Sequence, residues 1–360
     1  MSARELHFIV PGPLDQRTGG SLYDARIVEG LTALGWTVIA HGLEGRFPEG
    51  DVCAESSLTR TLSEIAQGAQ GARVVLDGLA MSPLPNPLRA HRDRLRLIAL
   101  IHHPLADETG LEAAERARFA RLESESLAQC AGAVVTSAFT ARRLGAYGVP
   151  ASHVRVAPPG TDPAKAAVGP GPGEPPRLLC VGAVSPRKGQ DVLVRALASI
   201  PVIPWSCICA GSLTHTPEFA DSVLELARAL GLEDRIDFPG ELGAPELDTL
   251  YHSASIFVLA THYEGYGMAL AEALARGLPV LSTHGGAVPD TVPLEAGVLV
   301  PPGDERALAA ALEELLTGPG GAERRAGLAE GSLRHGRSLL TWDDAAVAFE
   351  RAVRELSPGE

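Results

Sequence analysis

The chain has 360 residues, enough for two domains with sizeable hydrophobic cores. Hydrophobic residues make up 45% and charged residues 21%, as in ordinary globular proteins, and no apolar run approaches the roughly 18 residues of a membrane span. The net charge of −13 falls mostly on the part of the chain after residue 165, and this acidic balance argues against broad nucleic-acid binding.

The N-terminal apolar run is too short for a secretory signal, because Pro11 follows it almost at once. We therefore expect a cytoplasmic protein. The cysteines are odd in number and show no metal-ligand spacing, so we expect them to be reduced and buried. They are Cys53, Cys130, Cys180, Cys207 and Cys209.

The first half of the chain alternates short apolar runs with helical patterns. Strands are predicted over residues 6–11, 37–40, 73–77, 97–101 and 133–136, and helices over 21–34, 113–130 and 140–147. A loop containing Gly19 and Gly20 separates the first strand from the first helix. Nearly continuous apolar strands that alternate with helices indicate a parallel sheet covered on both faces.

The alternation restarts after a segment rich in glycine and proline. Strands are predicted over residues 177–182, 206–211, 236–238, 256–259, 279–282 and 297–300. Helices are predicted over residues 190–197, 218–230, 245–252, 268–276, 305–316 and 342–356. We therefore expect a first domain over 1–165, a linker over 166–176, a second domain over 177–337 and a C-terminal helix within 338–360. Ligands of such doubly wound sheets bind beyond the carboxyl ends of the strands, so we expect the site in a cleft between the domains.

The strongest chemical signal is a turn in which Glu264 is followed by Gly265, Tyr266 and Gly267. The turn lies between a predicted strand and a predicted helix, where free backbone N–H groups favour a phosphate. Glycine allows the backbone to approach such a ligand closely. Glu272 lies eight residues after Glu264, and both carboxylates could accept hydrogen bonds from sugar hydroxyls. The alternative is a helix cap with one solvated glutamate.

A second strand–loop–helix junction carries the adjacent cations Arg187 and Lys188. Such a pair is suited to neutralising a diphosphate. Lysine occurs elsewhere only at position 165, and an ammonium and a guanidinium are not interchangeable at phosphates. Two surface cations that only cap a loop are the alternative interpretation.

These motifs resemble the family 4 retaining glycosyltransferases of the GT-B fold, over almost the full length of the chain. The shared motifs are a Gly-Gly loop, a Lys-Gly loop, two glutamates eight residues apart, a Gly-x-Pro and a second Gly-Gly. Here they are Gly19-Gly20, Lys188-Gly189, Glu264 with Glu272, Gly277-Leu278-Pro279 and Gly285-Gly286. The resemblance implies two Rossmann-like, doubly wound domains that face a central cleft, with the C-terminal helix packing back toward the first domain.

The resemblance also implies a role for each matching residue. Glu272 would bind the nucleotide ribose, Glu264 the hydroxyls of the donor sugar, and Lys188 the diphosphate. The backbone amides of Tyr266, Gly267 and Met268 would contact phosphate or sugar, and Gly19 and Gly20 would approach the donor from the first domain. His103, at the end of the fourth strand, would lie near the transferred sugar.

One position departs from the family pattern. Many members place an arginine directly after the glycine that ends the first strand of the second domain, and this chain has Ala183 there. Our hypothesis is that Arg187 supplies the missing charge.

The resemblance implies front-face transfer with retention of configuration, from a donor that we expect to be a UDP- or GDP-sugar. No Asp-x-Asp pair occurs, so neither a metal nor a bound cofactor is expected. The acceptor, a small molecule, a glycan or a lipid-linked sugar, would contact first-domain loops. Candidate residues there are Asp15, His102 and Asp107.

Two other functional classes remain open. Another GT-B enzyme, an epimerase or a phosphorylase, would share the cleft, and a non-catalytic partner would keep the fold without turnover. Membrane-surface binding by the basic run at residues 89–96 is a weaker alternative to a solvated helix face.

Overall fold

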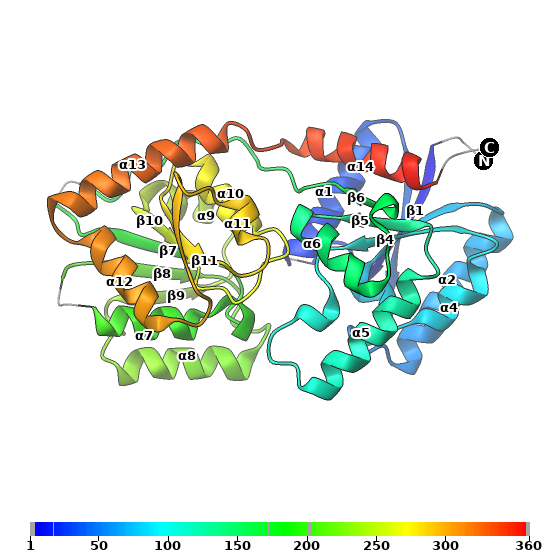
Figure 1. Cartoon of the computed structure of the whole chain (residues 1–360), viewed down its shortest axis with the longest axis horizontal. Helices are drawn as coiled ribbons and strands as arrows, with labels where there is room; N and C mark the ends of the chain where they lie inside the picture. The colour runs from blue at the N-terminus through cyan, green and yellow to red at the C-terminus, as the bar shows by residue number, and fades with distance from the viewer. Residues whose placement is uncertain (1–3, 17, 172, 201–202, 358–360) are drawn as a thin grey trace. The chain divides into compact units, whose positions relative to one another are not determined.

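The computed structural model describes residues 4–16, 18–171, 173–200 and 203–357. The chain forms two compact units, and Figure 1 colours the chain by residue number. Unit 1 comprises Met1–Gly160 and Leu340–Glu360, and unit 2 comprises Thr161–Leu339. Each unit contains a six-stranded parallel sheet, so the expected doubly wound α/β class is confirmed.

The sheet of unit 1 has the strand order β2-β1-β3-β4-β5-β6. Its strands are β1 Glu5–Pro11, β2 Thr37–Leu43, β3 Arg73–Asp77, β4 Arg96–Ile101, β5 Gly132–Val135 and β6 Val154–Val156. Its α-helices are α1 Gly19–Ala33, α2 Val52–Gly68, α3 Gly78–Met81, α4 Pro85–His91, α5 Ala113–Leu127, α6 Ala138–Arg143 and α14 Trp342–Leu356. Short 3₁₀ turns are η1 Leu105–Asp107, η2 Leu144–Tyr147 and η3 Ala151–His153.

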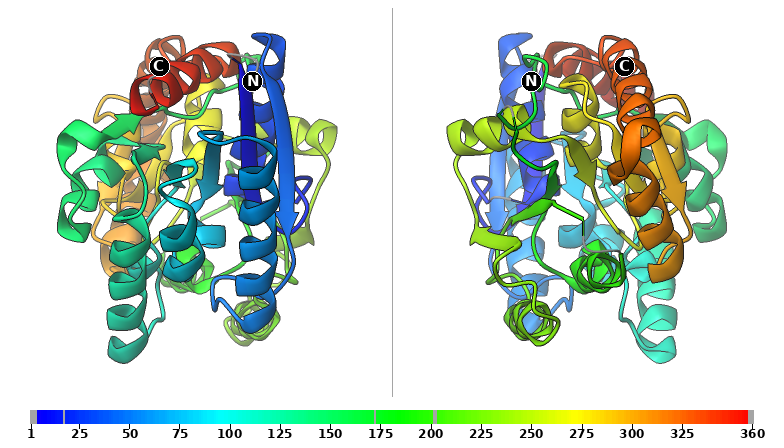
Figure 2. Two further views of the ribbon diagram at one scale, coloured as in Figure 1. Left: turned by 90° about the vertical axis from the view of Figure 1, so that its right-hand side faces the viewer. Right: turned by 90° about the vertical axis from the view of Figure 1, so that its left-hand side faces the viewer.

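The central strands of this sheet are buried, and successive side chains of each strand point to opposite faces, so both faces are covered there. Ile9 packs with α2, α4 and α5 in one core cluster. Phe8 lies on the other face, where its ring contacts Phe349 of the C-terminal helix α14. α14 also packs on α1, where a Cβ at Gly30 would lie 2.4 Å from that of Ala346. The expected return of the C-terminal helix to the first domain is therefore confirmed, and Figure 2 shows helices flanking the sheet.

The sheet of unit 2 has the strand order β12-β11-β10-β7-β8-β9. Its strands are β7 Arg177–Val181, β8 Ser206–Ala210, β9 Ile236–Gly240, β10 Ile256–Val258, β11 Val280–Thr283 and β12 Gly297–Val300. Its helices are α7 Gln190–Ser199, α8 Pro217–Ala229, α9 Ala244–Ser253, α10 Met268–Ala275, α11 Val288–Thr291, α12 Glu305–Leu316, α13 Gly318–Gly336 and the 3₁₀ turn η4 Pro186–Lys188. One continuous apolar cluster fills the unit.

Some local features differ from the sequence expectations. Gly19 and Gly20 form the first turn of α1, where the Thr18 hydroxyl accepts a hydrogen bond from the Ser21 amide as the N-cap. Cys53 is exposed, so not all the cysteines are buried. The helix α13 was not among the predicted helices. Three of its glycines, Gly321, Gly331 and Gly336, allow close packing, and a Cβ at Gly336 would lie 2.6 Å from the carbonyl oxygen of Leu274.

The start of the glycine- and proline-rich segment is bonded to unit 2. The backbone amide of Ala167 donates to the carbonyl of Arg276, and that of Val168 donates to the carbonyl of His252. Residue 172 lies outside the described residues.

Candidate functional site

The strand order of unit 2 places two loops side by side. β7 is the first strand of the unit, and its neighbours in the sheet are β8 and β10. The chain therefore builds outward in one direction from β7 to β9 and then continues on the other side with β10. Ligands of open parallel sheets bind beyond the strands' carboxyl ends at such a reversal. The loop after β7 carries Arg187 and Lys188, and the loop after β10 carries Glu264.

The two loops are bonded to each other through their backbones. Gly189 has φ +67°, and a Cβ there would lie 2.2 Å from the carbonyl oxygen of Ala260, so glycine allows this close approach. The Arg187 carbonyl accepts a hydrogen bond from the His262 amide at 2.7 Å and another from the Thr261 hydroxyl at 2.9 Å. The cations are thus held on a rigid turn.

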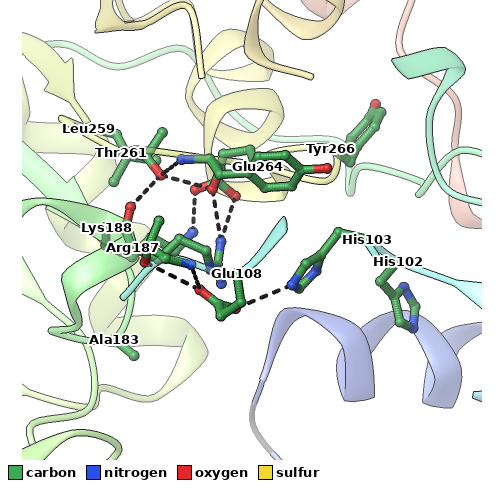
Figure 3. Close-up of polar contacts among 12 residues, drawn as sticks. His102, His103, Glu108, Ala183, Arg187, Lys188, Leu259, Thr261, Glu264 and Tyr266 are labelled. Carbon is green, nitrogen blue, oxygen red and sulfur yellow. Dashed lines mark hydrogen bonds and ion pairs between the residues drawn. The ribbon is translucent and has the colours of Figure 1, made fainter. Parts of the chain in front are cut away.

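Three predicted site residues form one ionic cluster, shown in Figure 3. The Lys188 ammonium lies 2.7 Å from Oε1 of Glu264, and the Arg187 guanidinium lies 3.7 Å from Oε2. Arg187 also donates to the carbonyl of Tyr263 at 3.0 Å. The Glu264 side chain is 7% exposed and that of Lys188 15%, so this pair is shielded from water.

The charge of Glu264 is maintained by these partners. Burial alone would raise the pKa of its carboxyl, but Lys188, Arg187 and a hydrogen bond from Thr261 lower it below its ordinary value. A carboxylate has about four lone-pair positions, so this one can hold both cations and still accept a ligand hydroxyl.

A glycine pair on the next loop supports the backbone of Glu264. Gly286 forms a parallel β-bridge with Glu264, and the amide of Ala287 donates to the Glu264 carbonyl at 2.8 Å. A Cβ on Gly286 would lie 2.3 Å from that carbonyl oxygen. The motif at Gly285-Gly286 therefore lets a third loop contact the glutamate turn.

The second glutamate lies in α10, whose N-cap is Gly267 with φ +92°. The Tyr251 hydroxyl donates to Oε2 of Glu272 at 2.9 Å. Burial raises the pKa of Glu272, while Tyr251 and Arg276 act in the opposite direction. Tyr266 directly precedes the N-cap, and Met268 begins the helix, so the Met268 amide belongs to the first turn, where backbone N–H groups have no helical acceptor.

In unit 1 the predicted residues also lie at the carboxyl ends of strands. Gly19 and Gly20 begin the helix after β1, and His102 directly follows β4. Nε2 of His102 lies 3.1 Å from Oδ1 of Asp24 and 3.2 Å from Oδ2 of Asp77. A Cβ on Gly20 would lie 3.2 Å from the His102 ring, which places this glycine directly against the imidazole.

The remaining first-domain candidates have different surroundings. Nε2 of His103 lies 3.3 Å from Oε2 of Glu108. Asp107 accepts hydrogen bonds from two nitrogens of Arg143, one at 2.9 Å, so it is engaged in a bidentate ion pair. Asp15 is exposed in a turn.

Several polar residues that support this arrangement were not singled out from the sequence. Asp24, Asp77, Tyr251 and Thr261 contact predicted residues from positions remote in the sequence. Asp77 ends a predicted strand, a position that could have signalled it. Asp24 and Tyr251 lie within helical patterns and look there like ordinary helix residues.

In the part of the chain that the structure describes, one group has the composition of a metal site, formed by Asp24, Asp77 and His102. Over the same residues no helix combines the length and the apolar character needed to cross a bilayer.

In comparisons with known proteins, two regions of the chain match family models. Residues 163–332 match the model for glycosyl transferases group 1, and residues 79–165 match that for glycosyltransferase family 4. A D-inositol 3-phosphate glycosyltransferase from Salinispora tropica is 34% identical over 187 residues, 49% of this chain and 38% of the relative. A GDP-mannose-dependent alpha-(1-6)-phosphatidylinositol monomannoside mannosyltransferase from Mycobacterium tuberculosis is 29% identical over 242 residues, 61% of this chain and 60% of the relative. The chain thus spans between about two fifths and three fifths of these relatives' lengths.

Solved structures share the fold over nearly the whole chain. A sucrose-phosphate synthase from Thermosynechococcus elongatus has a TM-score of 0.81 at 23% identity and covers 98% of this chain and 99% of its own. The Anabaena protein HepE in complex with UDP-glucose has a TM-score of 0.73 at 15% identity and covers 98% and 99%. Both sequence regions and the fold agree, and the chain belongs to the group 1, family 4 glycosyltransferases with the GT-B fold.

Proposed function

We propose that the chain is a retaining hexosyltransferase that moves a hexose from a nucleotide diphosphate sugar to an acceptor hydroxyl. The observation that carries this proposal is the cluster of Glu264 with Lys188 and Arg187 at the strand reversal of unit 2. Two cations and one carboxylate leave a net positive charge there, in the more acidic half of the chain. Such a cluster favours an anionic ligand that also carries hydroxyl groups.

Each part of the donor has a matching group in this proposal. The free lone pairs of Glu264 accept hydrogen bonds from the sugar hydroxyls, and Glu272 accepts them from the ribose. Lys188 and the amides at the start of α10 bind the diphosphate. The charge that develops on the leaving diphosphate is stabilised by groups already in place, which is usually the largest catalytic contribution.

The proposed reaction needs no protein nucleophile and no metal ion. The bond from the anomeric carbon to the diphosphate oxygen breaks, and a bond to the acceptor oxygen forms on the same face of the sugar. The acceptor hydroxyl proton passes to an oxygen of the leaving diphosphate. His103 contacts the transferred sugar, and the acceptor contacts loops of unit 1.

Either uridine or guanosine is the expected donor base. HepE, which shares the fold, was solved in complex with UDP-glucose, and the mycobacterial relative is described as GDP-mannose-dependent, which supports testing both bases. The acceptor is a small molecule, a glycan or a lipid-linked sugar. Arg187 is proposed to provide the cation that the family pattern puts at Ala183, because its guanidinium already lies beside the carboxylate of Glu264.

A panel of UDP- and GDP-sugars tests the proposal. The correct donor should raise the melting temperature according to its affinity and should be hydrolysed slowly without acceptor. When an acceptor is present, proton NMR should show that the transferred sugar has the same anomeric configuration in the product as in the donor. Glu264→Gln should abolish transfer. Glu225→Gln, at an exposed position of α8, is the control and should leave transfer unchanged.

The other outcomes of that panel identify the rival functions. Inversion of the anomer, or turnover only with a sugar phosphate, would contradict a retaining transferase. Conversion of the donor to another nucleotide sugar would indicate an epimerase. Binding of a donor without turnover across a full acceptor panel would indicate a non-catalytic partner.

A further inference from the structure

A partly buried histidine in unit 1, His102, is held between two aspartates from different elements. Asp24 comes from α1 and is 2% exposed, and Asp77 ends β3 and is 3% exposed. Both carboxylates face the same nitrogen, Nε2 of His102, at 3.1 and 3.2 Å. Oδ1 of Asp77 also accepts the amide of Leu79 at 2.7 Å, which orients this carboxylate toward the imidazole.

These contacts define the protonation of the ring. Ionised carboxylates only accept hydrogen bonds, so Nε2 must carry a proton to be stable between them. Burial alone would lower the pKa of His102, but Asp24 and Asp77 outweigh it and raise this pKa to about 10. Burial and the neighbouring Asp77 raise the pKa of Asp24 to about 6, although His102 opposes that rise. Both aspartates therefore favour the protonated, imidazolium form of the ring.

The same ring supports the first turn of α1. Gly20 lies against it, since a Cβ there would be 3.2 Å from Cδ2 of His102. The ring of Tyr23 meets it edge to face, with centroids 5.3 Å apart. The carbonyl of His102 accepts hydrogen bonds from the hydroxyls of Thr136 at 3.2 Å and Thr140 at 3.5 Å. The ring and the carbonyl of His102 are therefore held by the end of β3 and by the segments that follow β1 and β5.

We propose that His102 is a positioning residue of the transferase site, a charged link that holds the Gly19-Gly20 turn and the adjacent His103 in place. Its Nε2 faces both aspartates and is therefore not available to the acceptor. This inference rests on the proposed function for its catalytic consequence but not for its structural part. A metal ion at the same three residues would be a different site and is one outcome of the tests.

The structural claim, that His102 holds the start of α1, can be tested without measuring sugar transfer. In protein labelled with ¹⁵N-histidine, the His102 ring should stay doubly protonated from pH 7 to pH 9 and its signals should vanish in His102→Gln. Amide hydrogen exchange over residues 18–24 should rise at least tenfold in His102→Gln. It should not rise in His91→Gln, which removes a buried histidine that bonds Ser63 and the Pro87 carbonyl.

A neutral ring at pH 8, or unchanged exchange in residues 18–24, would overturn the proposal. So would stabilisation by Zn²⁺ or Mn²⁺ alone that His102→Gln removes, since that result assigns the cluster to a metal. None of these measurements depends on sugar transfer, so they decide the structural claim even if the proposed function fails.

The catalytic part is tested by a double-mutant cycle with the identified donor. His102→Gln should lower kcat about 10- to 100-fold, the loss expected from a small misplacement of catalytic groups. His91→Gln should leave kcat within about twofold while lowering the melting temperature. In the His103→Ala background, His102→Gln should cost less than it does in the wild type, because one of the two groups that it positions is gone. Additive losses would show that His102 does not act through His103.

Discussion

The ammonium of Lys188 lies 2.7 Å from a carboxylate oxygen of Glu264, although 76 residues separate them in the sequence. This contact joins the loop after β7 to the loop after β10, the two strands that meet at the reversal of the sheet. Because the pair is largely shielded from water, each charge depends on the other. Under the proposed function the pair both stabilises the two loops and binds the donor, and variants can separate the two effects.

Lys188→Met should both destabilise the protein and reduce turnover. Methionine keeps most of the side-chain volume, but Arg187, whose guanidinium is more distant, then remains as the cation beside Glu264. Breaking a buried ion pair in this way should lower the free energy of unfolding by about 3–5 kcal/mol. The kcat should fall about 10²- to 10³-fold. Adding Glu264→Gln should restore much of the stability in urea unfolding without restoring activity. If the single variant unfolds like the wild type, the pair contributes no net stability.

The missing arginine at Ala183 suggests a rescue experiment. Arg187→Ala should raise the dissociation constant for the nucleoside diphosphate by about 10- to 150-fold, as expected when a charged hydrogen bond of about 1.5–3 kcal/mol is lost. Ala183→Arg in the same protein should recover part of that affinity. Arg195→Ala, on an exposed pair with Glu305, provides the control. Unchanged affinity and turnover in Arg187→Ala would remove Arg187 from the diphosphate site.

Tyr251→Phe tests the second glutamate. Its hydroxyl donates to Glu272, so its loss raises the pKa of that buried carboxyl further and favours the neutral form. Donor affinity should fall about 3- to 10-fold, with a larger loss at pH 5.5 than at pH 8, measured by calorimetry. Tyr147→Phe in unit 1 should leave donor affinity unchanged. An equal loss at both pH values would indicate that Tyr251 does not act through the charge of Glu272.

Local features of the fold could be predicted from the sequence, whereas contacts between distant segments could not. The strand ends and the glycine turns follow from apolar runs and turn residues, which are local signals. The sequence also suggests Lys188 as the charge partner of the glutamate turn. It does not show that β7 and β10 are neighbours, because strand order depends on packing across the whole unit.

The residues that were missed share one physical reason. Asp24 in α1 has the sequence context of a solvated helix residue, and only the imidazole of His102 opposite it explains its burial. The glycines of α13 disfavour a helix by propensity, but the close contacts of Gly321, Gly331 and Gly336 with neighbouring backbones favour it. In both cases tertiary contacts override the local signal.

Glu123 should make stability fall as pH rises. This buried carboxyl accepts hydrogen bonds from the Ser82 hydroxyl and the Leu105 amide, and burial raises its pKa from 4.5 to about 8. The folded state therefore keeps a proton that the unfolded state loses above pH 4.5, so this contribution to the free energy of unfolding decreases between pH 4.5 and 8.

Glu123→Gln mimics the protonated form and should remove this dependence. Relative to the wild type, the variant should gain about 1.4 kcal/mol for each pKa unit of the shift as the pH rises from 5 to 8.5. Glu125→Gln, on the exposed side of the same helix, should show no such trend. Parallel pH profiles of wild type and Glu123→Gln would mean that Glu123 is ionised in the folded protein.

Gly286→Ala should move Glu264 rather than merely strain the backbone. Gly286 has φ +62°, and an added Cβ would lie 2.3 Å from the Glu264 carbonyl oxygen, so the glutamate turn must shift. Gly231 has φ +67° in the same unit but no heavy atom within 4 Å of such a Cβ, so Gly231→Ala carries the conformational strain alone. Both variants should lose about 1 kcal/mol of stability from that strain. Only Gly286→Ala should also lose donor affinity and at least about tenfold in kcat, because only there does the contact displace a carboxylate that binds Lys188. Equal kinetic losses in both would mean that the third loop does not position Glu264.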